Sequence, residues 1–156
     1  MDDHLSKEEV LALISRAFAD AEDAIQSHPV RSRAVYEEAK AAFLEGHDQH
    51  TQDSDWSDAH GLSSSELLLI HQYQMAMSFM SAWYQLYGDI PRRDQAAQSS
   101  SILVTGIGLD PQEVMGRFLL YEQTWLRMIQ SRGMKTGTGC LGTIVFVISA
   151  ILDLLV

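Results

Sequence analysis

The spacing of hydrophobic side chains predicts a helix near the start of the chain. Apolar residues recur there at intervals of three and four, which is the period of one face of an α-helix. Ser6 and Glu9 precede this pattern at the spacing of a capping box. We expect the helix over residues 6–28, because His28 is followed by Pro29 and the residue before a proline avoids helical backbone angles.

A second apolar period follows Pro29 and predicts a helix over residues 30–44. Gly46 stands just beyond the last apolar position. Because glycine commonly terminates helices, Gly46 is the expected C-cap of this second helix.

The third predicted helix has the clearest start in the sequence. Ser63 and Glu66 form another capping box, and Gly88 marks the end. Between them an apolar seam recurs at spacings of four and three over nearly three heptads, beside a second apolar row. The seam comprises Leu69, Tyr73, Ala76, Met80, Trp83 and Tyr87, and the row comprises Ile70, Met77 and Tyr84. A face this wide is typical of an inner helix of a bundle, whereas His71 lies off the seam and is expected at its boundary or surface.

Two further helices are predicted before residue 133. Residues 91–104 have a partial apolar face after a proline, which indicates a short helix. Asp110 and Pro111 then give an N-cap and a proline at the first helical position, and Gly133 gives a stop. The last of these helices carries a seam of Val114, Phe118, Tyr121, Trp125 and Met128.

Residues 139–156 are apolar around the whole circumference of a helix and therefore require burial in a protein core or in lipid. As a helix the run from Cys140 would be about 25 Å long, a little short of a hydrocarbon core. Asp153 also weakens the membrane interpretation, although basic residues precede the run as in a tail anchored from the cytoplasm. We favour a central helix of the bundle, with a membrane anchor as the alternative.

These patterns predict an all-α, single-domain helical bundle of five or six helices with an apolar C-terminal helix. The chain has 156 residues, of which 46% are hydrophobic, enough for one domain and one core. The expected division is an acidic helical part over residues 1–138 and the apolar helix over residues 139–156. We further expect the two longest seams to share one core that includes Leu69, Tyr73, Met80, Trp83, Phe118, Tyr121 and Trp125.

Charge narrows the class of partner. The net charge is −10, and residues 1–61 carry most of it, with 14 acidic and 5 basic residues. An acidic surface repels phosphate backbones, so nucleic acid is not an expected partner. The acidic, polar N-terminus does not resemble a signal peptide, and we expect a cytoplasmic location; a membrane-associated protein with a cytoplasmic N-terminal part is the alternative.

The segment of residues 46–61 has no apolar period and is predicted to be a mobile acidic loop. It also holds the densest set of potential metal ligands in the chain, because imidazole and carboxylate groups bind zinc and other divalent ions. We expect no bound metal, and a divalent metal site is the alternative. Its candidate ligands are His47, His50, Asp53, Asp55, Asp58 and His60.

No catalytic arrangement is evident in the sequence, so neither a catalytic residue nor a cofactor is expected. Nucleophile-elbow and zinc-protease motifs are absent, as are the paired E-x-x-H motifs of di-iron bundles. Residues 137–142 spell G-x-G-x-x-G, but a predicted helix precedes them where a dinucleotide site requires a strand. These glycines are better explained as a hinge.

We therefore interpret the chain as a non-enzymatic protein that binds or regulates another, cytoplasmic protein. The methionine-rich and aromatic seam of the third helix packs in the core or supplies an adaptable partner surface. The alternatives are a tail-anchored accessory subunit of a membrane complex, and a metal-dependent enzyme or sensor that uses the 46–61 loop. A homo-oligomer is left open. The candidate partner-binding residues are Tyr73, Met77, Met80, Trp83 and Tyr84.

Overall fold

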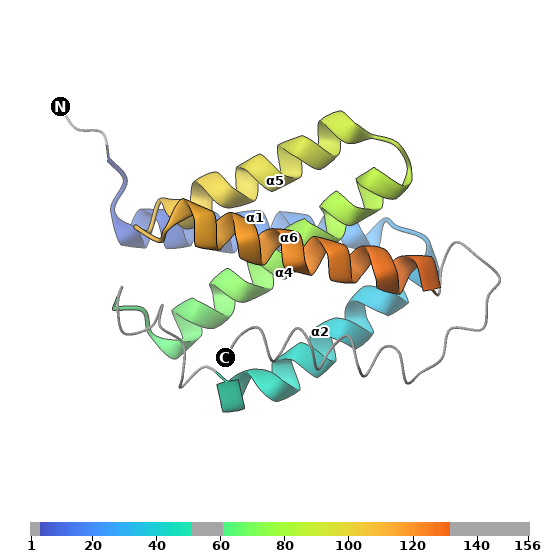
Figure 1. Cartoon of the computed structure of the whole chain (residues 1–156). Coiled ribbons are helices and arrows are strands. Elements are labelled where there is room, and N and C mark those ends of the chain that lie inside the picture. The colour runs from blue at the N-terminus through green and yellow to red at the C-terminus, as the bar shows by residue number, and fades with distance from the viewer. Residues whose placement is uncertain (1–3, 51–60, 132–156) are drawn as a thin grey trace.

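A computed structural model describes residues 4–50 and 61–131, and within them the side chains of all residues except 46–50. The elements in this part of the chain are helices, without strands, which confirms the all-α class (Figure 1). They form a five-helix bundle. The helices are α1 (Lys7–Gln26), α2 (Val30–His50), α4 (Ser64–Leu86), α5 (Ile90–Thr105) and α6 (Pro111–Ile129).

Two helices begin with the predicted capping boxes. The backbone N–H of Glu9 donates to Ser6 Oγ at 3.2 Å, and the N–H of Ser6 donates to Glu9 Oε2 at 2.7 Å. Ser63 and Glu66 repeat the arrangement before α4, with distances of 3.2 and 2.9 Å. Each box gives partners to N–H groups that a helix cannot satisfy internally, which determines where α1 and α4 begin.

α2 is longer than the sequence predicted. The expected C-cap at Gly46 is wrong, because α2 continues through it to His50. A glycine inside a helix costs about 1 kcal/mol relative to alanine, a penalty that a long helix tolerates where no proline follows. The backbone of His47 and His50 therefore belongs to the end of α2 and not to a loop.

α4 lies at the centre of the described bundle. It packs against α1, α5 and α6, and α2 makes smaller contacts with α4 and α6. In Figure 1, α6 crosses in front of α4 and α1 lies behind it, while α5 folds back from the end of α4. Most residues of α4 from Leu67 to Ala82 are consequently buried, on several sides of the helix.

Several side chains of α4 are polar and yet buried. They form hydrogen bonds with α6 or with the backbone of α4 itself. Gln74 Nε2 donates to the carbonyl of Val114 at 3.3 Å, and Ser78 Oγ donates to the carbonyl of Met75 at 2.9 Å. Trp125 Nε1 donates to that same Met75 carbonyl at 3.1 Å.

His71 is also buried, with 2% of its surface exposed. The expected boundary or surface position of His71 is wrong. α4 is covered beyond its apolar seam, because helices pack on several of its sides.

Among the described residues the buried hydrophobic side chains form two clusters, so the expectation of one shared core is wrong. Tyr121 and Trp125 belong with Met80 to a cluster that α2 closes through Tyr36 and Phe43. Tyr73 belongs to the other, with residues of α1, α5 and the start of α6, and Leu69 packs against it. Phe18 and Met77 contact both clusters. The two ends of the α4 seam therefore pack against different parts of the surrounding helices. The Met80 end packs against α2 and the later parts of α1 and α6, and the Tyr73 end packs against α5 and the earlier parts of α1 and α6.

None of the helices in the described ranges combines the length and the apolar character needed to cross a membrane. The apolar segment 139–156 and the glycine motif 137–142 lie outside those ranges. Both interpretations of the segment, as a core helix and as a membrane anchor, therefore stay predictions.

Candidate partner-binding groove

A groove of about 560 Å³ runs between α1, α4 and α5. Its floor is a stripe along α4 in which the spacing of four, three and four residues brings the side chains to one face of the helix. The stripe consists of Tyr73, Met77, Met80 and Tyr84. These are four of the five residues that the sequence indicated as candidate partner-binding residues.

The floor is mainly apolar and partly open. Tyr73 and Met80 are buried, with 1% and 8% exposed, whereas Met77 and Tyr84 are half-buried. Burial raises the pKa of Tyr73 to about 12, so its hydroxyl group stays neutral at physiological pH. Methionine and tyrosine together offer an adaptable apolar surface with a few polar atoms.

The walls are built from small side chains, which explains why the floor is open. α1 contributes Ala17 and Ala21, one turn apart, and α5 contributes Ala96 and Ser99. Because these side chains are short, neither wall fills the space above the floor. Leu103 lines the end of the groove near Tyr73.

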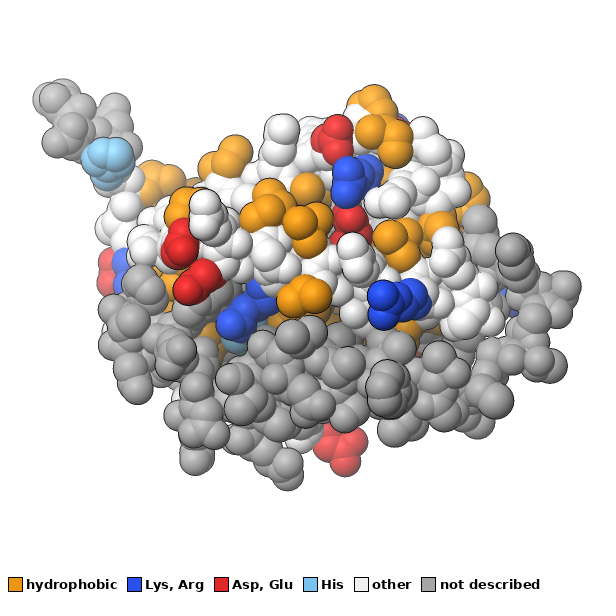
Figure 2. All heavy atoms as spheres, in the orientation of Figure 1, with side chains coloured by type: hydrophobic (Ala, Val, Ile, Leu, Met, Phe, Trp, Pro, Cys, Tyr) orange, Lys and Arg blue, Asp and Glu red, His pale blue; other side chains and the backbone are white. Residues whose placement is uncertain are grey.

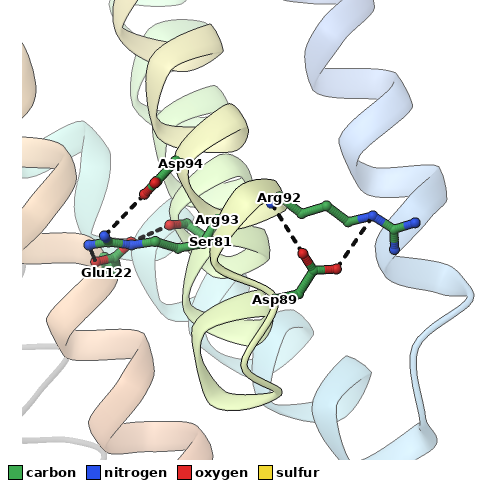
Figure 3. A network of polar contacts seen from close by, with 6 residues as sticks. All are labelled: Ser81, Asp89, Arg92, Arg93, Asp94 and Glu122. Carbon is green, nitrogen blue, oxygen red and sulfur yellow. Dashed lines mark hydrogen bonds and ion pairs between the residues drawn. The ribbon is translucent and has the colours of Figure 1, made fainter.

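Opposite charges mark the two rims. Asp20 stands on the α1 side, and Arg92 and Gln95 stand on the α5 side. The Arg92 guanidinium lies 5.8 Å from the centre of the Tyr84 ring, within cation–π range, and its Nε is 3.5 Å from Asp89 Oδ2. Figure 3 shows the Arg92 side chain reaching from α5 toward α1. An occupant of the groove would thus meet a negative rim and a positive rim.

The next residue, Arg93, points to the opposite side of α5 and holds this wall against α6 (Figure 3). Its Nη2 donates to Glu122 Oε1 at 2.9 Å and its Nε donates to Glu122 Oε2 at 3.4 Å. Ser81 Oγ donates to the same carboxylate from α4. The hydrogen bond with Glu122 raises the pKa of Arg93, which keeps the guanidinium charged. α5 is therefore anchored on the side that faces away from the groove.

Trp83, the fifth candidate residue, does not line the groove. Its ring packs 4.7 Å from the ring of His28 and 4.5 Å from that of Tyr87, between centres. A separate cavity of about 190 Å³ lies there, bordered by Val35 and Ile129. Burial lowers the pKa of His28. Trp83 belongs to the aromatic junction between α4 and the α1–α2 turn.

Figure 2 shows the side of the bundle on which α6 lies. Hydrophobic side chains appear there in small groups among charged and polar ones. The exposed apolar residues of the described part of the chain include Ile102, Leu119 and Leu120, and single exposed apolar residues are normal on a protein surface.

The metal hypothesis is not tested by the described residues. The side chains of His47 and His50, and the whole of Asp53, Asp55, Asp58 and His60, lie outside them. Within the part of the chain that is described, no group of three or more potential ligands comes together to hold a metal ion.

The sequence indicated the floor of the groove but missed its walls. Ala17 and Ala21 read as ordinary members of a helix face, and Arg92 and Ser99 belong to a helix with only a weak apolar period. A usable signal was the recurrence of short side chains at helical spacing in two helices that flank a seam of large residues.

Comparison of the chain with protein-family models, with curated proteins and with solved structures found no match.

Proposed function

We propose that this chain is a non-enzymatic interaction protein that binds an apolar helical segment of a partner protein in the groove between α1, α4 and α5. The observation that carries the proposal is the open stripe of Tyr73, Met77, Met80 and Tyr84 along α4. Amphipathic helices commonly bind by laying an apolar face into such a groove, where methionine side chains adapt to the incoming surface.

The dimensions of the groove support a helical occupant. From Tyr73 to Tyr84 the floor extends about 16 Å along α4, or three helical turns. Three turns present residues i, i+3 or i+4, i+7 and i+11 of a partner helix, and these positions repeat the spacing of the floor itself.

The charges favour one orientation of the partner and one class of partner surface. Asp20 on one rim and Arg92 on the other would pair with a base and an acid on opposite flanks of the bound helix. The net charge of −10 would in addition steer a basic partner toward the chain.

Selection from a displayed library of helical 18-residue peptides against the full chain tests this function. Ser99 lines the groove and is exposed, so Ser99→Trp should plug it without disturbing the core. We expect selected peptides to lose affinity for Ser99→Trp by at least about tenfold, or about 1.4 kcal/mol.

Gln98→Trp is the matched control, because Gln98 is exposed on the same helix but does not line the groove. Binding to this variant should be unchanged. Peptides that bind both variants equally well would place the interaction elsewhere, and a failure to select any peptide would remove the support for a helix-binding groove.

The two alternative functions depend on residues outside the described ranges. A tail-anchored accessory subunit would require residues 139–156 to enter lipid, and a metal-dependent enzyme or sensor would require the ligands of the 46–61 segment to converge.

A further inference from the structure

We propose that residues 139–156 of this same chain occupy the groove between α1, α4 and α5 as a helix, so that a partner segment has to displace them. This inference rests on the proposed function, because it assigns a regulator to the same groove. It also gives the apolar segment a place within the protein.

The groove and the segment have complementary requirements. Met77 and Tyr84 remain half-buried in the centre of the bundle, although helices cover most other positions of α4. The segment carries apolar residues that call for burial, and from residue 141 to residue 152 no charge interrupts it. A helix over those residues is about 16 Å long, the same as the floor from Tyr73 to Tyr84.

The position where α6 ends makes this route short. Ile129, the last residue of α6, lines a cavity with Trp83, and Trp83 precedes the groove residue Tyr84 in α4. The chain thus leaves α6 beside the end of α4 at which the groove begins. Residues 132–138 span up to about 23 Å when extended, about twice the width of a helix.

This route also sets the direction of the bound segment. It would enter near Tyr84 and Arg92, whose side chains lie together, and run toward Tyr73 and Leu103. Cys140 would then lie near the entrance, within reach of Gln95, and Asp153 would lie beyond the far end of the floor.

A tethered occupant has an advantage over a second copy of the chain. A short flexible linker gives an effective concentration on the order of millimolar, which a free copy does not reach in dilute solution. A membrane is a poorer destination, because Asp153 interrupts a run that is already shorter than a hydrocarbon core.

Cys140 is the single cysteine of the chain, which allows a direct test in the full-length protein. Gln95→Cys places a thiol on the groove, and Gln123→Cys places one on an exposed position of α6. Both variants are oxidised mildly at low protein concentration, and intramolecular disulfides with Cys140 are counted by mass spectrometry. Gln123 is much nearer to Cys140 along the chain, so a randomly placed segment would favour it.

We expect the disulfide in Gln95→Cys to form at least about tenfold faster than in Gln123→Cys, since a disulfide requires the two Cβ atoms to approach closely. Adding Ser99→Trp to the Gln95→Cys variant should slow the reaction, whereas adding Gln98→Trp should not. Equal rates in Gln95→Cys and Gln123→Cys would overturn the inference.

Two other results would assign the segment elsewhere and also overturn the inference. Disulfide-linked dimers as the main product would indicate a second copy as the occupant. Co-sedimentation of the full chain with phosphatidylcholine vesicles, with loss of the intramolecular disulfide, would place the segment in lipid.

The disulfide experiment and the peptide selection can give different results, and each tests a different proposal. Groove-binding peptides without a disulfide at Gln95→Cys would leave the proposed function in place and remove its internal occupant. A fast disulfide without any selected peptide would leave an internal packing contact and remove the partner-binding function.

Discussion

Arg93 and Glu122 form a bidentate ion pair whose two members differ sharply in exposure. The Glu122 side chain keeps 3% of its surface exposed, whereas that of Arg93 keeps 29%. The pair thus places a nearly buried carboxylate under a cation that still contacts water. Through Ser81 it also touches α4, so one carboxylate connects three helices.

Replacing Arg93 should lower the free energy of unfolding far more than replacing the neighbouring Arg92. Arg93→Ala would leave the buried Glu122 carboxylate without its charged partner, and we expect the free energy of unfolding to fall by about 3–5 kcal/mol. Arg92→Ala removes an exposed pair with Asp89 and should change it by less than about 1 kcal/mol. Urea denaturation compares the two; similar losses would show that Arg93 does not stabilise Glu122.

Trp83 of α4 and Trp125 of α6 should also differ in how much they contribute to stability. Trp125 is fully buried and donates its indole N–H to Met75 and Ser78, so Trp125→Ala should cost about 3–5 kcal/mol of unfolding free energy. Trp83 is half-buried, and Trp83→Ala should cost at least about 1 kcal/mol less. Chemical denaturation of both variants checks the order, which would be reversed if the aromatic junction were the main stabilising cluster.

Stability should fall as the medium is acidified because of His28. Its folded-state pKa lies below the ordinary value of 6.5 because burial disfavours the charged ring. As the pH falls, His28 of the unfolded chain therefore takes up its proton before His28 of the folded chain does. The contribution of His28 to the free energy of unfolding is complete above pH 6.5, and it decreases as the pH falls from 6.5 toward the lower pKa of the folded state. The slope is at most about 1.4 kcal/mol per pH unit for one proton.

Thermal unfolding between about pH 7 and pH 5 measures this dependence for His28. His28→Phe should flatten the curve, whereas replacement of the exposed His4 by glutamine should leave it unchanged. An unaltered curve for His28→Phe would assign the acid sensitivity to other groups.

Two glycines should respond to alanine with opposite signs. Gly88 follows the end of α4 with φ of 74°, a region that L-residues avoid, so Gly88→Ala should destabilise the fold by about 1–2 kcal/mol. Gly116 lies inside α6 with open space around it, and Gly116→Ala should stabilise the helix by about 0.5–1 kcal/mol. Differential scanning calorimetry measures the stability of both variants. A lower stability of Gly116→Ala would indicate that this position of α6 does not tolerate a Cβ atom.

The helix starts could be predicted because their causes are local. Ser6 with Glu9, and Ser63 with Glu66, act within one turn of backbone, and Pro111 fixes its own backbone angle. The end of α2 could not be predicted in the same way. Gly46 carries only a modest helix penalty, and interactions elsewhere in a helix decide whether such a penalty terminates it.

The candidate site depended on packing between helices, which an apolar pattern specifies incompletely. The seam of α4 could be predicted as buried, yet which part stays open depends on Ala17 and Ala21 of α1 and Ser99 of α5. The burial of His71 likewise depends on how many neighbours surround α4. A periodic pattern identifies the faces of a helix but not the size of the side chains that will meet them.

The polar residues of α4 have a consequence for how the groove is presented. Gln74, Ser78 and Ser81 lie one position beyond Tyr73, Met77 and Met80, and Gln74 and Ser81 bond to α6. An apolar contact alone would tolerate some rotation of α4 about its axis, whereas these directional bonds are satisfied at one angle. They fix the rotation of α4 about its axis, so that the stripe of methionine and tyrosine side chains faces the groove. If the groove binds a partner as proposed, its surface is formed in advance, and an occupant does not have to reorient the central helix when it docks.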